Sequence, residues 1–123
     1  MLSGERLLII EDVFLIALGM QFALEGAHAQ QTVFARNFEE AAGLADRFGE
    51  FDLAIVNPPR EGTDDVRIAE LLVAAGPAIV VCTAARLDLS GGPLAGAEII
   101  IKPYTDDDLL AACHRALAKR QPA

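Results

Sequence analysis

The stretch Leu7-Leu8-Ile9-Ile10-Glu11-Asp12 decides the fold class, because four consecutive apolar residues run directly into two carboxylates. A strand that is buried on both faces has such a continuous apolar run, and strands of this kind belong to parallel sheets. Further short runs with strand character lie at residues 31–35, 53–56, 78–82 and 99–101. Segments of mostly helical length separate them, so we predict a doubly wound α/β domain with a five-stranded parallel sheet.

Capping residues mark where two of the helices begin. Asn37, with Glu40 three residues later, predicts a helix that runs to about residue 48. Thr105, with Asp108 three residues later, predicts a last helix that runs to about residue 120. The segment between the fourth and fifth strands contains Ser90-Gly91-Gly92-Pro93, which is poor helix material. We expect a single turn or a loop there.

The composition is that of one globular domain, residues 1–123, with 53% hydrophobic residues and a formal net charge of -8. Excess negative charge disfavours binding to nucleic acid and to anionic membrane surfaces. No apolar run reaches the ~18–20 residues that a membrane span needs. Cys82 and Cys113 form no disulfide framework, so we expect two buried free thiols in a cytoplasmic protein.

Polar side chains follow four of the five predicted strands. Glu11 and Asp12 follow the first strand, Asn57 the third, Thr83 the fourth and Lys102 the fifth. The carboxyl ends of parallel strands meet at one edge of the sheet, where such folds bind their ligands. Paired carboxylates with a hydroxyl and an ammonium group suit Mg²⁺ beside a phosphoryl group. We therefore predict a phosphoryl-handling site at this edge.

From Leu7 to about Ala118 the sequence resembles the receiver domains of bacterial response regulators. Four segments carry the resemblance: Ile9–Asp12, Asp52–Asn57, Thr83-Ala84 and Ile101–Tyr104. The resemblance implies the flavodoxin-like (CheY-like) fold, with strand order 2-1-3-4-5 and a fourth helix that the composition here shortens. It also implies Mg²⁺ at the acidic pair and phosphoryl transfer from a histidine kinase to an aspartate that ends the third strand.

The sequence departs from the family at two positions. The phosphoacceptor aspartate falls on Asn57, whose carboxamide is neutral and a poor nucleophile. Deamidation is not expected to restore the acid, because the following Pro58 has no N–H to attack the amide. With one carboxylate lost, Glu11-Asp12 would be a vestigial metal site, for which we predict millimolar Mg²⁺ affinity or none. Ile99 also stands three positions before Lys102, where the family often has an aromatic switch residue.

These departures predict a two-component signalling receiver module that is not an enzyme and acts through phosphorylation-independent protein contacts. Its partner would be a histidine kinase, another regulator or a second copy in a homodimer. The alternative is a phosphorylatable receiver in which an introduced Asn57 replaces the acceptor aspartate, with Glu11, Asp12, Thr83 and Lys102 functional in the parent protein. Without a bound cation, Lys102 is expected to neutralise the acids and to approach Asp12 or Asn57.

The first predicted helix, over residues 13–25, has no charged residue from Val13 to Leu24. A surface helix normally carries a charged face opposite its apolar stripe. The expected sheet-facing stripe is Ile16, Met20 and Leu24, and a second apolar stripe at the same period is Phe14, Leu18 and Phe22. Two interpretations of the second stripe remain: part of it packs under the last helix, or it is an exposed surface that binds a partner.

Overall fold

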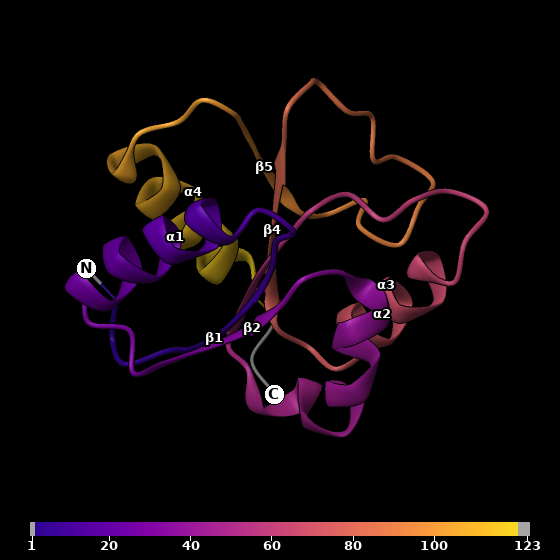
Figure 1. Cartoon of the computed structure of the whole chain (residues 1–123), viewed down its shortest axis with the longest axis horizontal. Coiled ribbons are helices and arrows are strands. Elements are labelled where there is room, and N and C mark those ends of the chain that lie inside the picture. The colour runs from indigo at the N-terminus through magenta and orange to yellow at the C-terminus, as the bar shows by residue number, and fades with distance from the viewer. Residues whose placement is uncertain (1, 121–123) are drawn as a thin grey trace.

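The structure is a computed structural model that describes residues 2–120 and contains one five-stranded parallel sheet between two layers of helices (Figure 1). The strand order is β2-β1-β3-β4-β5, as predicted. The strands are β1 (Arg6–Ile10), β2 (Gln31–Ala35), β3 (Leu53–Val56), β4 (Ala78–Thr83) and β5 (Glu98–Ile101). The helices are α1 (Phe14–Gly26), α2 (Phe38–Ala41), the 3₁₀ helix η1 (Ala42–Glu50), α3 (Asp65–Ala74) and α4 (Asp106–Lys119).

Alternate residues of the central strands belong to two apolar clusters, one on each face of the sheet. Leu7 and Ile9 of β1 belong to the cluster under α1 and α4, whereas Leu8 and Ile10 belong to the cluster under α2, η1 and α3. Figure 1 shows the same division, with α1 and α4 on one side of the strands and α2 and α3 on the other. Burial on both faces is why the β1 sequence is continuously apolar.

Two predicted caps are present, and one of them differs in detail. Thr105 and Asp108 bond each other's backbone N–H groups, which completes the expected capping box of α4. The Asn37 side chain accepts from the N–H of Glu40 at 2.8 Å, but the Glu40 carboxylate accepts from the N–H of Arg36 instead of Asn37. The helix predicted to reach residue 48 is α-helical only to Ala41 and continues as η1. Its second half contains Gly and Asp, which are weak helix formers.

The segment from residue 84 to residue 97, between β4 and β5, contains only turns and bends. The structure therefore agrees with the expectation of a turn or loop where the receiver fold has its fourth helix. Leu94 is buried in the cluster under α3 and anchors this segment to the sheet. Backbone entropy at the paired glycines and the proline constraint explain why no helix forms.

Helix α1 buries one stripe and exposes the other. Met20 and Leu24 are buried as expected, and Ile16 packs partly against the same cluster. Phe14 and Phe22 are 73% and 68% exposed, with Leu18 half-buried between them. The last helix therefore leaves both phenylalanines uncovered, and the α1 residues that lie near its start include Leu15 and Ile16. No helix within residues 2–120 is long and apolar enough to cross a membrane.

Candidate functional site

The predicted polar residues lie at the carboxyl edge of the sheet. Backbone hydrogen bonds continue the strand pairing there by one residue beyond the ends of β1 and β3. The N–H of Asn57 donates to the carbonyl of Ile10, and the N–H of Glu11 donates to the carbonyl of Ala35, both at 3.0 Å. These bonds hold the residues that follow β1 and β3 in sheet register. Their side chains therefore meet at one place, as the strand-end argument predicted.

The Asn57 amide bridges the acidic pair. Its Nδ2 donates to Glu11 Oε2 at 3.2 Å and to Asp12 Oδ1 at 3.0 Å. Because both neighbours are carboxylate oxygens that can only accept, the amide must turn its NH₂ group toward them. This orientation leaves Asn57 Oδ1 buried without a hydrogen-bond partner. The two N–H groups of a neutral amide thus stand between the two carboxylates.

Lys102 pairs with Glu11, so the expectation that it approaches Asp12 or Asn57 is wrong. Its Nζ lies 3.1 Å from Glu11 Oε1, in a direction unsuited to a hydrogen bond, and acts as a nearby positive charge. The Glu11 side chain is 1% exposed, whereas Asp12 is exposed to solvent. A buried carboxylate without a counter-charge is far less stable than an exposed one, which explains the choice of partner. Glu11 Oε2 also accepts from the N–H of Val13, just before α1.

Thr83 is buried beside the site but uses its hydroxyl within its own loop. The hydroxyl donates to the Ala85 carbonyl at 3.0 Å and accepts from the Ala85 N–H at 3.3 Å. Its link to the other site residues is a backbone bond, in which the N–H of Lys102 donates to the Thr83 carbonyl at 2.8 Å. Of the five predicted residues, Glu11, Asp12, Asn57 and Lys102 are joined through side chains and Thr83 through its backbone.

The pKa of Asp12 lies below the ordinary value for an aspartate. The Glu11 carboxyl, which shares this site, is the largest cause, and the Asn57 amide and the Lys102 charge lower the pKa further. A lowered pKa keeps this carboxylate ionised at neutral pH. Asp12 thus remains available as an anionic acceptor for the amide.

The receiver fold implies Mg²⁺ at this edge, and the donor set here does not fit that ion. The inward oxygens of Glu11 and Asp12 already accept from the Asn57 amide, and the other oxygen of Glu11 faces Lys102. Among residues 2–120 no group of three or more His, Cys, Asp or Glu side chains could hold a metal. Mg²⁺ needs unoccupied, anionic oxygen ligands in a near-octahedral arrangement.

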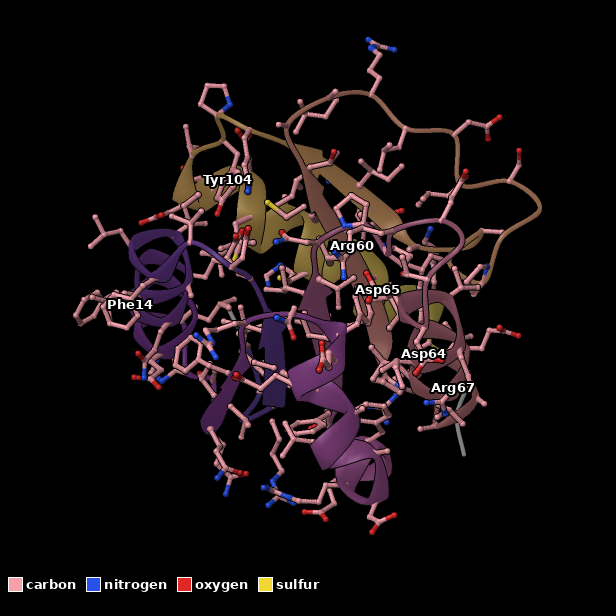
Figure 2. All side chains as sticks on the ribbon, turned by 45° about the vertical axis from the view of Figure 1, so that its right-hand side comes forward. Phe14, Arg60, Asp64, Asp65, Arg67 and Tyr104 are labelled. Atoms are coloured by element: carbon pink, nitrogen blue, oxygen red, sulfur yellow. The ribbon has the colours of Figure 1, made fainter. Side chains whose placement is uncertain are left out.

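A cavity of about 340 Å³ opens in front of Asp12 and Asn57, between the loops that follow β2 and β3. Arg60 and Asp65 line it on one side and point toward each other in Figure 2. Arg60 donates to Asp65 Oδ2 from both its backbone N–H and its guanidinium, at 3.0 and 3.1 Å. Burial raises the pKa of Asp65, but these bonds and the Arg60 charge outweigh burial and lower it. The sequence does not predict this pair, because nothing in the spacing of Arg60 and Asp65 shows that the loop folds back.

Both cysteines are buried and free, as expected. Burial raises the pKa of the Cys82 thiol to about 11 and that of Cys113 to about 12. Both thiols are therefore protonated at neutral pH and behave as small apolar side chains. Burial also raises the pKa of Tyr104, which packs beside Lys102 between α1 and α4.

Solved structures of response regulator receiver proteins share this fold. A receiver protein from Sinorhizobium medicae is 18% identical with a TM-score of 0.79, and covers 98% of this chain and 100% of its own. A CheY-like receiver domain protein from Methanospirillum hungatei is 25% identical with a TM-score of 0.75, covering 95% of this chain and 96% of its own. A putative response regulator from Chloroflexus aurantiacus is 22% identical with a TM-score of 0.73, covering 95% and 100%.

No protein-family model matches the chain, and no curated protein sequence matches it. The strand order and these structural matches define the chain as a protein with the CheY-like receiver fold. The site at its carboxyl edge has two acidic residues, Glu11 and Asp12, and Lys102 around the Asn57 carboxamide.

Proposed function

We propose that this chain is a two-component signalling receiver that has lost its phosphoacceptor and acts through phosphorylation-independent protein contacts. The observation that carries the proposal is the Asn57 amide, which donates to both Glu11 and Asp12. In this arrangement the amide satisfies the acidic pair that would otherwise attract a cation. The switch that phosphorylation would operate is thereby held in one state.

The chemistry of Asn57 supports the loss of phosphoryl transfer. Attack on a phosphoryl group needs an electron pair on an anionic oxygen, whereas the amide oxygen is neutral and resonance-stabilised. The Nδ2 atom faces the two carboxylates and is equally unsuited, because its lone pair is delocalised into the carbonyl. Pro58 follows directly and lacks the N–H through which an asparagine usually deamidates. The natural chain is therefore expected to keep the amide.

Charge supports the same conclusion. Glu11 and Asp12 with Lys102 leave a net charge of about -1 at the site, counting the three ionised side chains as full charges. A phosphoryl dianion would meet two carboxylates and one ammonium group without a divalent cation to offset them. The site is thus suited to stability in its present state and not to binding an added phosphate.

The output would be a surface contact with no catalytic step of its own, in the cytoplasm. The apolar stripe of Phe14, Leu18 and Phe22 supports this, because both phenylalanines are exposed and such patches on a domain of this size often mark partner sites. The candidate partners are a histidine kinase, another regulator or a second copy. A second candidate function is a phosphorylatable receiver with an introduced Asn57, which is favoured by the retained Glu11, Asp12 and Lys102.

Phosphorylation with a small acyl phosphate donor and Mg²⁺ tests the proposal. The chain is expected to give no acid-labile phosphoryl adduct by intact-mass spectrometry, and Asn57→Asp is the matched variant. Labelling of the unchanged chain at Asn57 would overturn the proposal. If only the variant is labelled, at position 57, the remaining pocket is competent for phosphorylation. The loss of phosphorylation is then due to one side chain. A variant that also fails to label would extend the loss to the rest of the pocket.

A further inference from the structure

The edge strand β2 borders the α1 edge that carries Phe14, Leu18 and Phe22, and Glu25 is the acidic residue at the boundary between them. β2 pairs with β1 on one side, and no strand within residues 2–120 pairs with its other side. Its sequence, Gln31–Ala35, contains neither a charged residue nor a proline. Soluble proteins usually protect an open edge with such residues, since unpaired backbone groups accept a further strand.

The aromatic residues of α1 and β2 lie on the same side of the sheet. Phe34 is in register with Ile9, whose side chain belongs to the cluster under α1, so Phe34 points to that side and is 40% exposed. The edge of α1 that carries the stripe borders β2, because the Glu25 carboxylate accepts from the Thr32 hydroxyl at 3.3 Å. Figure 2 shows Phe14 projecting outward from the amino-terminal turn of α1.

The exposed aromatic area is large enough to contribute substantially to an interface. Phe14, Phe22 and Phe34 are 73%, 68% and 40% exposed. With roughly 150–250 Å² for a phenylalanine, they present on the order of 300–400 Å² in each copy. A standard interface buries about 800 Å² on each partner, so the aromatics would supply about 40–50% of such an area.

The charge of this surface favours a second copy as its occupant. From Val13 to Arg36 the chain carries one acidic residue, Glu25, and one basic residue, Arg36, although its net charge is -8. Two copies of net charge -8 repel each other, and this surface adds little to the repulsion because its two charges are opposite in sign. Glu25 lies beside the amino-terminal half of β2, and Arg36, 79% exposed, follows its carboxyl end.

We propose that two copies pair their β2 strands antiparallel about a two-fold axis at Val33, which extends the sheet across the dimer. The axis places the α1 stripes of the two copies on the same side of the sheet, facing each other. It also brings Arg36 of each copy to the end of the strand where the other copy has Glu25. The interface is self-complementary, as closed two-fold dimers require.

The dimer supplies a partner for the proposed function. Only the signalling role of this contact, and not its existence, rests on that function. A monomeric chain would overturn the interface and leave the phosphorylation proposal intact, whereas labelling at Asn57 would do the reverse. The first measurement is the molar mass of the full chain by light scattering and sedimentation, from about 10 µM to 1 mM. A monomer–dimer equilibrium is expected in this range. Amide hydrogen exchange in Gln31–Ala35 is expected to slow as the concentration rises.

A matched pair of α1 variants tests the surface itself. Phe22→Glu and Leu15→Glu each add one negative charge at an exposed position, 68% and 75% exposed. Leu15 borders the cavity beside Pro103 and Tyr104, on the side of α1 away from β2. Phe22→Glu is expected to weaken dimerisation by about tenfold or more with an unchanged melting temperature, and Leu15→Glu by less than about twofold. Equal effects of the two variants, or a sharply lowered melting temperature for Phe22→Glu alone, would overturn the interface.

A charge exchange tests the antiparallel arrangement. Glu25→Arg and Arg36→Glu are each expected to weaken the dimer, because like charges then meet at the strand ends. The double variant restores opposite charges across the axis and is expected to recover most of the lost affinity. Failure of the double variant to recover affinity would exclude the two-fold axis at Val33. Thermal melts of all three variants separate this effect from the local ion pair between Arg36 and Glu40.

Discussion

Replacing Asn57 by aspartate should destabilise the metal-free protein, although the two side chains have nearly the same shape. The amide donates to Glu11 at 3.2 Å and to Asp12 at 3.0 Å. A hydrogen bond to a charged group contributes about 1.5–3 kcal/mol, so the loss of both removes roughly 3 kcal/mol at the lower bound. A third carboxylate about 3 Å from two others also repels them. The repulsion energy of each pair is at most about 5 kcal/mol at an effective dielectric constant of 20.

Solvent at the exposed Asp12 and a small rotation of the new side chain will relieve most of this repulsion. We therefore expect Asn57→Asp to lower the free energy of unfolding by about 3–4 kcal/mol at pH 7 in the presence of a chelator. The neighbouring charges raise the pKa of the new carboxyl above its unfolded value. The destabilisation is then largest above that pKa and decreases as the pH falls, because the protonated group can again donate.

Mg²⁺ should reverse much of the loss, since three carboxylates now face one another. At 10 mM Mg²⁺ and a dissociation constant of about 0.1–1 mM, linkage returns roughly 1.4–2.7 kcal/mol. The unchanged chain should gain much less, in line with the predicted millimolar affinity or none. The assay is urea unfolding followed by circular dichroism, with chelator and with Mg²⁺.

Asn37→Asp is the matched control, because it makes the same amide-to-carboxylate change at a helix cap where either residue is favourable. It is expected to leave stability unchanged within about 0.5 kcal/mol. If Asn57→Asp were as stable as the unchanged chain in chelator, the bridging role of the amide would be refuted. Equal stabilisation of both proteins by Mg²⁺ would refute the argument that the amide occupies the cation position.

Two further substitutions test the ion pairs. Lys102→Met removes the counter-charge of Glu11, whose side chain is 1% exposed. This variant should lower the free energy of unfolding by about 2–4 kcal/mol. The double variant with Glu11→Gln should recover most of that loss, because no buried carboxylate is then left unpaired. A loss below about 1 kcal/mol in urea unfolding would contradict the pairing. Hydrogen bonds from Lys119 and Arg115 hold the pKa of Glu98 below its ordinary value. The ionised Glu98 therefore stabilises the folded chain above the unfolded pKa of its carboxyl. This contribution disappears as the pH falls through the folded pKa. Glu98→Gln should therefore cost about 1 kcal/mol at pH 7 and progressively less toward pH 3, and a difference independent of pH would contradict the assignment.

The strands and most of the site could be predicted from the sequence because they depend on local or strongly constrained features. A run such as Leu53–Val56 has few favourable states other than a strand buried on both faces. The strand-end residues Glu11, Asp12 and Asn57 then follow by geometry, because parallel strands bring their carboxyl ends to one edge. The capping box at Thr105 was equally accessible, since its bonds span only three residues.

What the sequence left open was decided by contacts between distant segments and by burial. Whether Lys102 approached Glu11 or Asp12 depended on which carboxylate the packing buried, and the two are adjacent in the chain. The direction of the second stripe of α1 depended on where α4 and β2 lie beside it, since helical periodicity cannot distinguish a stripe under a neighbouring helix from one facing solvent. The sequence alone thus determines which side chains reach the carboxyl edge of the sheet, whereas tertiary packing decides which charges need partners and which apolar surface is left uncovered.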